Sequence, residues 1–80
     1  MIKPTIGRVL HFYPRGSKPT DQPLPALVAH VWSDTCVNLA VFDANGGVYQ
    51  DETTSILLVQ EGNEVPTGGN YAVWPSRACG

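Results

Sequence analysis

The two histidines and two cysteines of this 80-residue chain are the first candidates for a nucleophile, a base or a metal ligand. Cys36 and His30 fall on neighbouring runs of strand-forming residues, so a thiol beside an imidazole base is conceivable. That chemistry also needs an oxyanion donor, and no motif in the chain supplies one. The spacing of His11, His30, Cys36 and Cys79 does not match a zinc site. We therefore expect no enzyme activity, no metal site and no cofactor.

The alternation of apolar residues in the middle of the chain predicts the register of a central hairpin. A three-residue loop at 33–35 places Val31 opposite Val37 and keeps the apolar side chains of both strands on one side. A slip of one residue would turn every side chain to the other face, so this register is expected. The further pairs are Ala29 with Leu39, Leu27 with Val41, Val28 with Ala40, His30 with Asn38 and Trp32 with Cys36. The predicted core face is Leu27, Ala29, Val31, Val37, Leu39, Val41 and Tyr49.

The opposite face of this hairpin is the first candidate for a binding surface. It carries Val28, His30, Trp32, Cys36, Asn38, Ala40 and Phe42. Trp32 and Phe42 offer a large contact area, and His30 and Asn38 offer donors and acceptors that would orient a partner. Two alternatives stay open. Either the face binds a partner or a second copy of the chain, or the proline-rich loop and the C-terminal tail cover it as a second small core.

Aromatic rings and arginines near the two ends of the chain form a second set of candidates. A ring of Tyr13, Trp32 or Trp74 could stack on a nucleobase while Arg8, Arg15 or Arg77 holds its phosphate. If the first and last strands are neighbours, Tyr13, Tyr71 and Trp74 gather at one end of the fold. The alternative is that these rings only close a small barrel.

Five strand-forming runs must position these residues, and no helical period interrupts them. They span 6–13, 26–32, 36–42, 48–60 with a break at Asp51 and Glu52, and 70–74. Asp43, Asn45 and Gly46 are typical of a type I turn with a glycine bulge, which pairs Val41 with Tyr49 and Phe42 with Val48.

The order of loops predicts the architecture. A proline-rich loop at 14–25, which we expect to be extended and ordered, precedes a three-strand meander and a short closing strand. This layout favours one domain over 1–80: a small five-strand antiparallel barrel, SH3-like or OB-like, with no long helix.

Composition limits the partners. The chain is 42% hydrophobic but only 15% charged, with a net charge of -2. This charge offers no general attraction for DNA or for anionic membranes. The small core and the shortage of charge predict a homo-oligomer. No stretch resembles a signal peptide or a membrane span, so we expect a cytosolic protein in which Cys36 and Cys79 are reduced thiols, a bridge between them being the alternative.

Several segments together resemble a family of small uncharacterised proteins of tailed bacteriophages. The matching segments are 1–9 (MIKPTIGRV), 21–24 (DQPL), 37–46 (VNLAVFDANG), 59–62 (VQEG) and 71–75 (YAVWP), which span nearly the whole chain. That family tends to carry Cys where this chain has Ala72, which argues against an essential thiol at this position.

The resemblance implies a phage protein made in the cytoplasm of a bacterial host, and it brings no characterised active site. Together with the binding face, it leads us to expect a non-catalytic accessory protein for host takeover or counter-defence. Its ligand would be a host protein or a small nucleotide signal. A virion-associated structural protein is the alternative, and an enzyme with a Cys/His site is a distant one.

Overall fold

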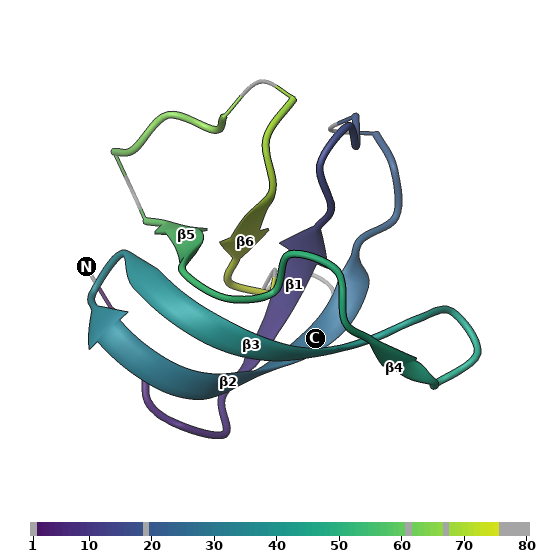
Figure 1. Cartoon of the computed structure of the whole chain (residues 1–80). Coiled ribbons are helices and arrows are strands. Elements are labelled where there is room, and N and C mark those ends of the chain that lie inside the picture. Colours follow the sequence, from purple (N-terminus) through teal and green to yellow (C-terminus); the bar gives the residue numbers. More distant parts are fainter. Residues whose placement is uncertain (1, 19, 61, 67, 76–80) are drawn as a thin grey trace.

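Six strands make up the regular structure of the computed structural model, which describes residues 2–18, 20–60, 62–66 and 68–75. The strands are β1 (Val9–Tyr13), β2 (Leu24–Ser33), β3 (Cys36–Phe42), β4 (Val48–Tyr49), β5 (Ile56–Val59) and β6 (Tyr71–Val73) (Figure 1). Residues 6–8, expected in the first strand, form part of a turn instead, in which the Arg8 amide donates to the Thr5 carbonyl at 3.2 Å. Within the described residues, no helix could cross a membrane.

Five of the strands close into a barrel in chain order. β1 pairs with β2, β2 with β3, β3 with β5, β5 with β6, and β6 returns to β1. β4 lies outside the ring and extends β3 as a hairpin that projects from the barrel (Figure 1). The predicted small all-β barrel is confirmed, and its dimensions and strand order are consistent with an SH3-like or OB-like barrel.

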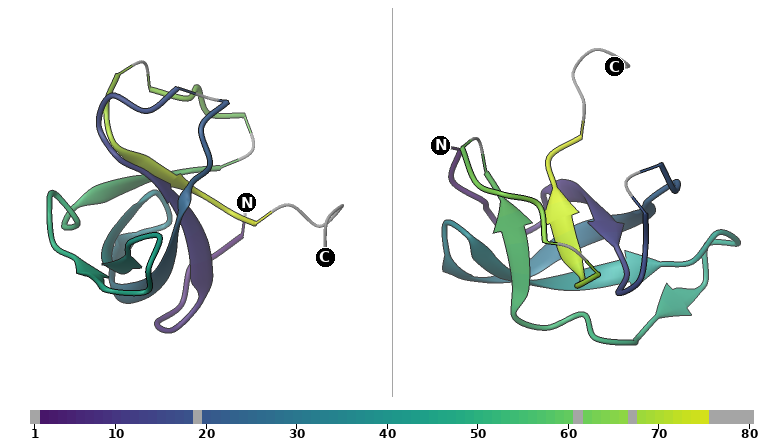
Figure 2. Two further views of the ribbon diagram at one scale, coloured as in Figure 1. Left: turned by 90° about the vertical axis from the view of Figure 1, so that its right-hand side faces the viewer. Right: turned by 90° about the horizontal axis from the view of Figure 1, so that it is seen from above.

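The barrel is mixed, because β5 and β6 run parallel rather than antiparallel. Two parallel neighbours need a connection that returns the chain to the end at which the first strand began. The segment between Val59 and Tyr71 makes this return, and β5, β6 and β1 then lie side by side above the long β2–β3 hairpin in the right-hand view of Figure 2.

Alternate residues of β1, β3 and β5 point inward and form one core with residues of β2 and β6. Leu10 and Phe12 of β1 and Ile56 and Leu58 of β5 have at most 1% of their surface exposed. The remaining buried apolar residues are Ala26, Val28, Val37, Leu39, Val41, Tyr71 and Ala72. On β3 the predicted core face is therefore correct, and Tyr49 and Val31 pack against this core as partly buried residues.

On β2 the predicted faces are wrong at three residues, because the strand contains a bulge at Ala29. Val28 pairs with Leu39 and His30 with Asn38, so Ala29 is an extra residue on β2. A bulge places two consecutive residues on the same side of a sheet. Consequently Leu27 and Ala29 are exposed, whereas Val28, which we expected on the second face, lies in the core.

A second irregularity changes the turn between β2 and β3. Ser33, rather than Trp32, lies opposite Cys36, and Trp32 is the extra residue. The connection is thus Asp34 and Thr35 alone instead of the three-residue loop that we expected. The bulge at Trp32 compensates for the missing loop residue, so the predicted pairing of Val31 with Val37 is kept.

The predicted turn between β3 and β4 is confirmed, as are the pairs Val41–Tyr49 and Phe42–Val48. The Gly46 amide donates to the Asp43 carbonyl at 3.0 Å, and the Asp43 amide donates to the Gly47 carbonyl at 2.8 Å. Asp43 Oδ1 also accepts from the amides of Asn45 and Gly47, both at 2.9 Å. Asp43 thus closes the turn with its main chain and its carboxylate.

Replacing Gly46 by alanine should lower the free energy of unfolding by about 1 kcal/mol. Gly46 has a φ of 83°, in the left-handed region that disfavours a residue with a Cβ. No atom lies within 4 Å of the position that this Cβ would occupy, so the cost is conformational and not steric. Urea unfolding measures it. An unchanged midpoint would show that the turn does not require this conformation.

Candidate functional site

Trp32 is a large apolar side chain that is exposed and yet held in one orientation. Trp32 has 61% of its surface exposed to solvent. Its Nε1–H donates to Asn38 Oδ1 at 3.0 Å, and its ring meets the ring of His30 edge to face, with centroids 4.5 Å apart. Fixing a side chain before binding lowers the entropy cost of the complex. Trp32 therefore has the properties of a preorganised contact residue.

Asn38 positions Trp32 and also anchors the segment that precedes β5. Its Oδ1 accepts a second hydrogen bond from the Ser55 amide at 2.7 Å. Ser55 and Glu52 are the two described non-glycine residues with positive φ, at 53° and 51°. The predicted strand break at Asp51 and Glu52 is therefore confirmed. A positive φ is unfavourable for Glu52 and Ser55, and side-chain hydrogen bonds from Asn70 and to Asn38 maintain it.

An uncharged sheet surface continues from Trp32 across the outside of three strands. Val9 lies opposite Leu27, and Leu27 lies opposite Ala40, so these three form one row across β1, β2 and β3. Val9 is 50% and Leu27 is 38% exposed. We call this surface the Trp32 face and define it by Val9, Leu27, His30, Trp32, Asn38 and Ala40.

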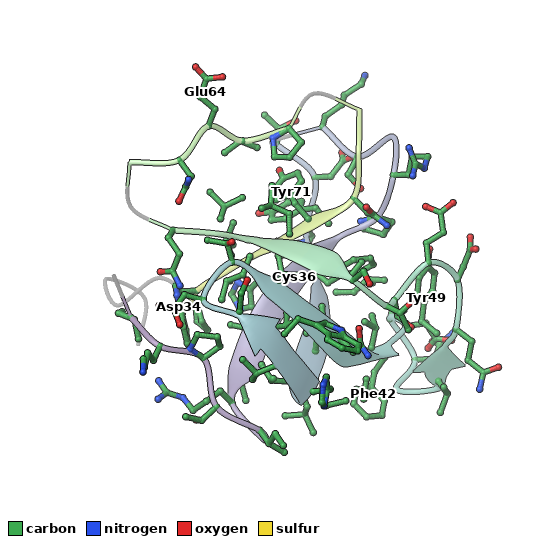
Figure 3. All side chains as sticks on the ribbon, turned by 60° about the vertical axis from the view of Figure 1, so that its left-hand side comes forward. Asp34, Cys36, Phe42, Tyr49, Glu64 and Tyr71 are labelled. Atoms are coloured by element: carbon green, nitrogen blue, oxygen red, sulfur yellow. The ribbon has the colours of Figure 1, made fainter. Side chains whose placement is uncertain are left out.

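The absence of Asp, Glu, Lys and Arg from β1, β2 and β3 distinguishes the Trp32 face from an ordinary solvent-exposed sheet. The outward face of an antiparallel sheet is normally polar when it meets water. The charged residues among those described lie instead in the turns and connections, such as Arg8, Asp34 and Glu64. Figure 3 shows Asp34 at the turn end of β3 and Glu64 projecting from the β5–β6 connection.

The predicted members of this face are only partly brought together. His30, Trp32 and Asn38 form one cluster. Phe42 is half-buried and lies beside β4, at the end of β3 remote from Asp34 (Figure 3). Phe42 is four positions along β3 from Asn38, which corresponds to about 13 Å. Among the described residues, the proline-rich loop does not cover this face, because His30, Trp32 and Ala40 are exposed, and the end of the C-terminal tail (76–80) lies outside the described residues.

The second predicted set, of aromatic residues and arginines, is divided between two places. Tyr13 and Tyr71 stack with ring centroids 4.9 Å apart and an angle of 14° between the rings. Trp74 lies instead near the start of β1, where the Arg8 guanidinium is 5.2 Å from the centre of its ring. β1 and β6 are neighbours as predicted, but the three aromatic rings do not gather at one end.

The arginines of this set are engaged within the chain or lie outside the described residues. Arg15 Nε donates to Glu52 Oε2 at 2.9 Å, in an ion pair whose side chains are both largely exposed. Such a surface pair contributes only about 0–1 kcal/mol to stability. Arg8 already covers Trp74, and Arg77 lies outside the described residues, as does Cys79.

Two tyrosines near these residues stay neutral at physiological pH. Burial raises the pKa of Tyr71 above its ordinary value, and Tyr13 adds to this effect. Burial also raises the pKa of Tyr49, with further contributions from the carboxylates of Asp51 and Glu52. Neither phenol therefore supplies a negative charge or a base to its surroundings.

The residues suggested for thiol chemistry are not arranged as a catalytic pair. Cys36 lies opposite Ser33, whereas His30 lies opposite Asn38 and packs on Trp32. Cys36 is a half-buried free cysteine. In the part of the chain that the structure describes, no group of three or more His, Cys, Asp or Glu side chains could hold a metal ion.

A groove that the sequence did not indicate lies at the start of β2. It has a volume of about 410 Å³ and is lined by His11, Tyr13, Gln22, Pro23 and Pro25. A neighbouring groove of about 270 Å³ shares Gln22, Pro23 and Pro25 and reaches Ala44 in the β3–β4 turn. Long loops often carry function, so the segment 14–25 was a signal in the sequence. The groove itself also needs His11, which lies opposite Pro25 only after β1 and β2 have paired.

Comparisons with models of protein families, with curated proteins and with solved structures found no match to this chain.

Proposed function

We propose that this protein is a non-catalytic binding protein that engages a partner protein through the Trp32 face. The observation that carries the proposal is the exposed Trp32, which Asn38 and His30 hold in one orientation. Tryptophan is among the residues that contribute most to protein–protein binding, provided that the complex removes it from water. The uncharged row of Val9, Leu27 and Ala40 supplies further apolar area on the outer surface of the same three strands.

A protein partner fits this site better than a nucleotide does. A nucleotide site combines an accessible ring face with a cation for the phosphate. Trp32 neighbours His30 and Asn38 but no arginine contact, Arg8 already lies over the ring of Trp74, and Arg15 is paired with Glu52. Neither described arginine of the predicted set therefore lies free beside the exposed Trp32 ring.

The setting that we propose is the cytoplasm of a bacterium infected by a tailed phage, with host takeover or counter-defence as the role. The resemblance of the opening segment 1–9 and of the closing segment 71–75 to small phage proteins supports this setting. A virion-associated structural role is the alternative.

Affinity capture from infected cells tests the proposal. Tagged wild-type protein, Trp32→Ala and the control Val65→Ala are used side by side, because Val65 is 49% exposed in the β5–β6 connection and outside the Trp32 face. A host protein retained by the wild type and by Val65→Ala, but lost with Trp32→Ala, is the expected result. Equal retention by all three forms, or recovery only with phage particles, would contradict it. Heating the captured protein and analysing the supernatant by mass spectrometry reveals a retained nucleotide, which would favour the other ligand class.

A second copy of this chain is the other partner that an uncharged face accommodates. A two-fold dimer places the same surface of both subunits in contact, and a face without charges avoids the repulsion that like charges would cause there. We propose that the isolated protein dimerises through the Trp32 face when the host partner is absent. The dimer then dissociates when that partner binds.

Light scattering on the purified protein at micromolar concentration should give twice the chain mass of 8.6 kDa. Trp32→Ala should shift the population to the monomer, because the substitution removes the largest apolar side chain from the contact. A monomeric mass for the wild type over the whole concentration range would exclude the dimer. That result would not affect the proposal that a host protein binds the Trp32 face.

A further inference from the structure

The groove at the start of β2 is a second candidate site, separate from the Trp32 face. We call it the Pro23 groove and define it by His11, Tyr13, Gln22, Pro23 and Pro25, the residues that line its volume of about 410 Å³. The adjoining groove of about 270 Å³ shares Gln22, Pro23 and Pro25 and adds Leu24, Asp43 and Ala44. The two hollows therefore flank the segment 22–25. Their lining residues come from β1, from the start of β2 and from the β3–β4 turn, so a ligand that crosses segment 22–25 could contact both hollows.

The lining of the groove is uncharged. Among the described lining residues, Asp43 is the one carboxylate, it lines only the adjoining hollow, and its Oδ1 already accepts hydrogen bonds from the amides of Asn45 and Gly47. Asp21, which precedes Gln22 in the chain, is not in this lining, and its Oδ2 accepts from the Lys18 main-chain amide at 2.9 Å. A phosphate or a carboxylate would meet no lysine or arginine among the described residues that line the two hollows, so the lining favours a neutral ligand.

The two prolines limit how a peptide could be held. Pro23 and Pro25 carry no N–H, so this stretch cannot donate the regular hydrogen bonds by which a ligand is added to a sheet as a further strand. Binding must instead use ring contacts with a few hydrogen bonds from His11 and Gln22. A polyproline II helix suits this requirement, because it has no internal hydrogen bonds and presents apolar rings with accessible carbonyl groups.

The walls of the groove are preorganised. One face of Tyr13 stacks on Tyr71, which is only 4% exposed, so the tyrosine that lines the groove has a rigid support behind it. The proline-rich loop is held by turns, in which the Ser17 amide donates to the Pro14 carbonyl at 3.0 Å and the Asp21 amide to the Lys18 carbonyl at 2.9 Å. A site ordered in advance loses little conformational entropy when a ligand binds.

We infer that the Pro23 groove binds an extended, uncharged, proline-containing peptide segment of a partner protein. The aromatic and proline rings of the groove pack on the proline rings of the ligand, and the Gln22 amide and the His11 imidazole hydrogen-bond to its carbonyl groups. This inference goes beyond the proposed function, because it assigns a second site and a ligand class that do not depend on Trp32.

Titration of the ¹⁵N-labelled protein with synthetic peptides tests the inference by NMR. The probes are decaproline, a (Pro-Pro-Leu)₃ peptide, a Gly-Ser peptide of similar length, and adenosine monophosphate as a charged aromatic compound. The proline peptides should shift the amide signals of His11, Tyr13, Gln22, Leu24 and Ala44, with a Kd on the order of 1 mM or tighter. The Gly-Ser peptide and the nucleotide should leave these signals unchanged.

Variants assign the binding to the groove. Pro23→Lys places a charged chain in the groove and should weaken peptide binding by at least about tenfold. Val65→Lys introduces the same charge outside the groove, and Trp32→Ala alters the other site, so both should bind the peptides like the wild type. The inference is overturned by absent shifts with both proline peptides, by equal shifts with the Gly-Ser peptide or the nucleotide, or by shifts confined to the Trp32 face. Trp32→Ala should lose the captured host protein and still bind the proline peptides. Failure of the peptide titration and failure of the capture experiment are therefore separate results.

Discussion

Replacement of Trp32 by alanine should weaken the complex with the host partner about 30-fold, equivalent to ~2 kcal/mol of binding free energy. The indole is fixed by Asn38 and His30, so most of its apolar surface is available to the partner without a large loss of rotamer entropy. Because the residue is 61% exposed, its removal should change the free energy of unfolding by no more than about 0.5 kcal/mol. Calorimetric titration with the captured partner gives the affinity, and urea unfolding gives the stability.

Variants of Asn38 separate the positioning of Trp32 from its contact area. Both hydrogen bonds to this side chain use Oδ1 as acceptor, one from Trp32 Nε1 and one from the Ser55 amide. Asn38→Asp retains an acceptor oxygen at this place and should preserve most of the affinity. Asn38→Ala leaves Trp32 free to rotate, and re-ordering one such side chain on binding costs about 1 kcal/mol, or roughly fivefold in affinity. An unchanged affinity in Asn38→Ala would show that partner binding does not need the fixed indole.

Replacement of Gln60 by leucine should lower the free energy of unfolding by about 3 kcal/mol or more. Gln60 is 3% exposed, and its Nε2 donates to the carbonyls of Ile2 at 2.7 Å and Asp34 at 2.9 Å. Its Oε1 accepts from Trp74 Nε1 at 3.1 Å. Each partner left unsatisfied inside the protein costs about 1–3 kcal/mol. For a domain of this size the loss is a large part of the total stability, which urea unfolding measures directly.

The variant Gln60→Glu isolates the two donated hydrogen bonds, because its side chain has almost the same shape. At neutral pH a carboxylate oxygen would face the carbonyls of Ile2 and Asp34, so the charged form is disfavoured in the folded state and the pKa of the introduced carboxyl would rise. A raised folded-state pKa means that stability is retained below the unfolded value of about 4.3 and lost as pH rises through the folded value. The stability deficit against wild type should therefore be smaller at low pH than at neutral pH. A deficit that does not vary with pH would indicate that the Nε2 contacts contribute little.

Local turn chemistry and strand alternation determined a large part of this fold. Asp43 and Gly46 define a turn whose geometry depends on a few adjacent residues, and with it the pairing of Val41 with Tyr49. The alternation in β3 likewise placed Val37 and Leu39 in the core. The proximity of His30 and Asn38 followed from their predicted pairing, because residues paired across a hairpin are neighbours whatever the rest of the chain does. Trp32 joins them from an unpaired bulge position that the predicted register did not contain.

The parts that the sequence could not determine depend on contacts between distant segments. β2 must pair with β1 on one side and with β3 on the other while it curves around the barrel, and the bulges at Ala29 and Trp32 accommodate both. A bulge adds one residue without a distinct local pattern, and therefore the exposure of Leu27 was not foreseen. The parallel pairing of β5 with β6 depends on the path of the connection between them.

The Pro23 groove and the burial of Gln60 were decided by tertiary structure for the same reason. Gln60 is a polar residue at the end of a strand, a position that is usually solvated. It becomes buried because Ile2, Asp34 and Trp74, which come from three other parts of the chain, satisfy its donors and acceptor. The β3–β4 turn and the faces of β3 thus follow from neighbours in the sequence, whereas the bulges of β2, the buried polar contacts and the grooves follow from the closure of the barrel, which brings distant segments together.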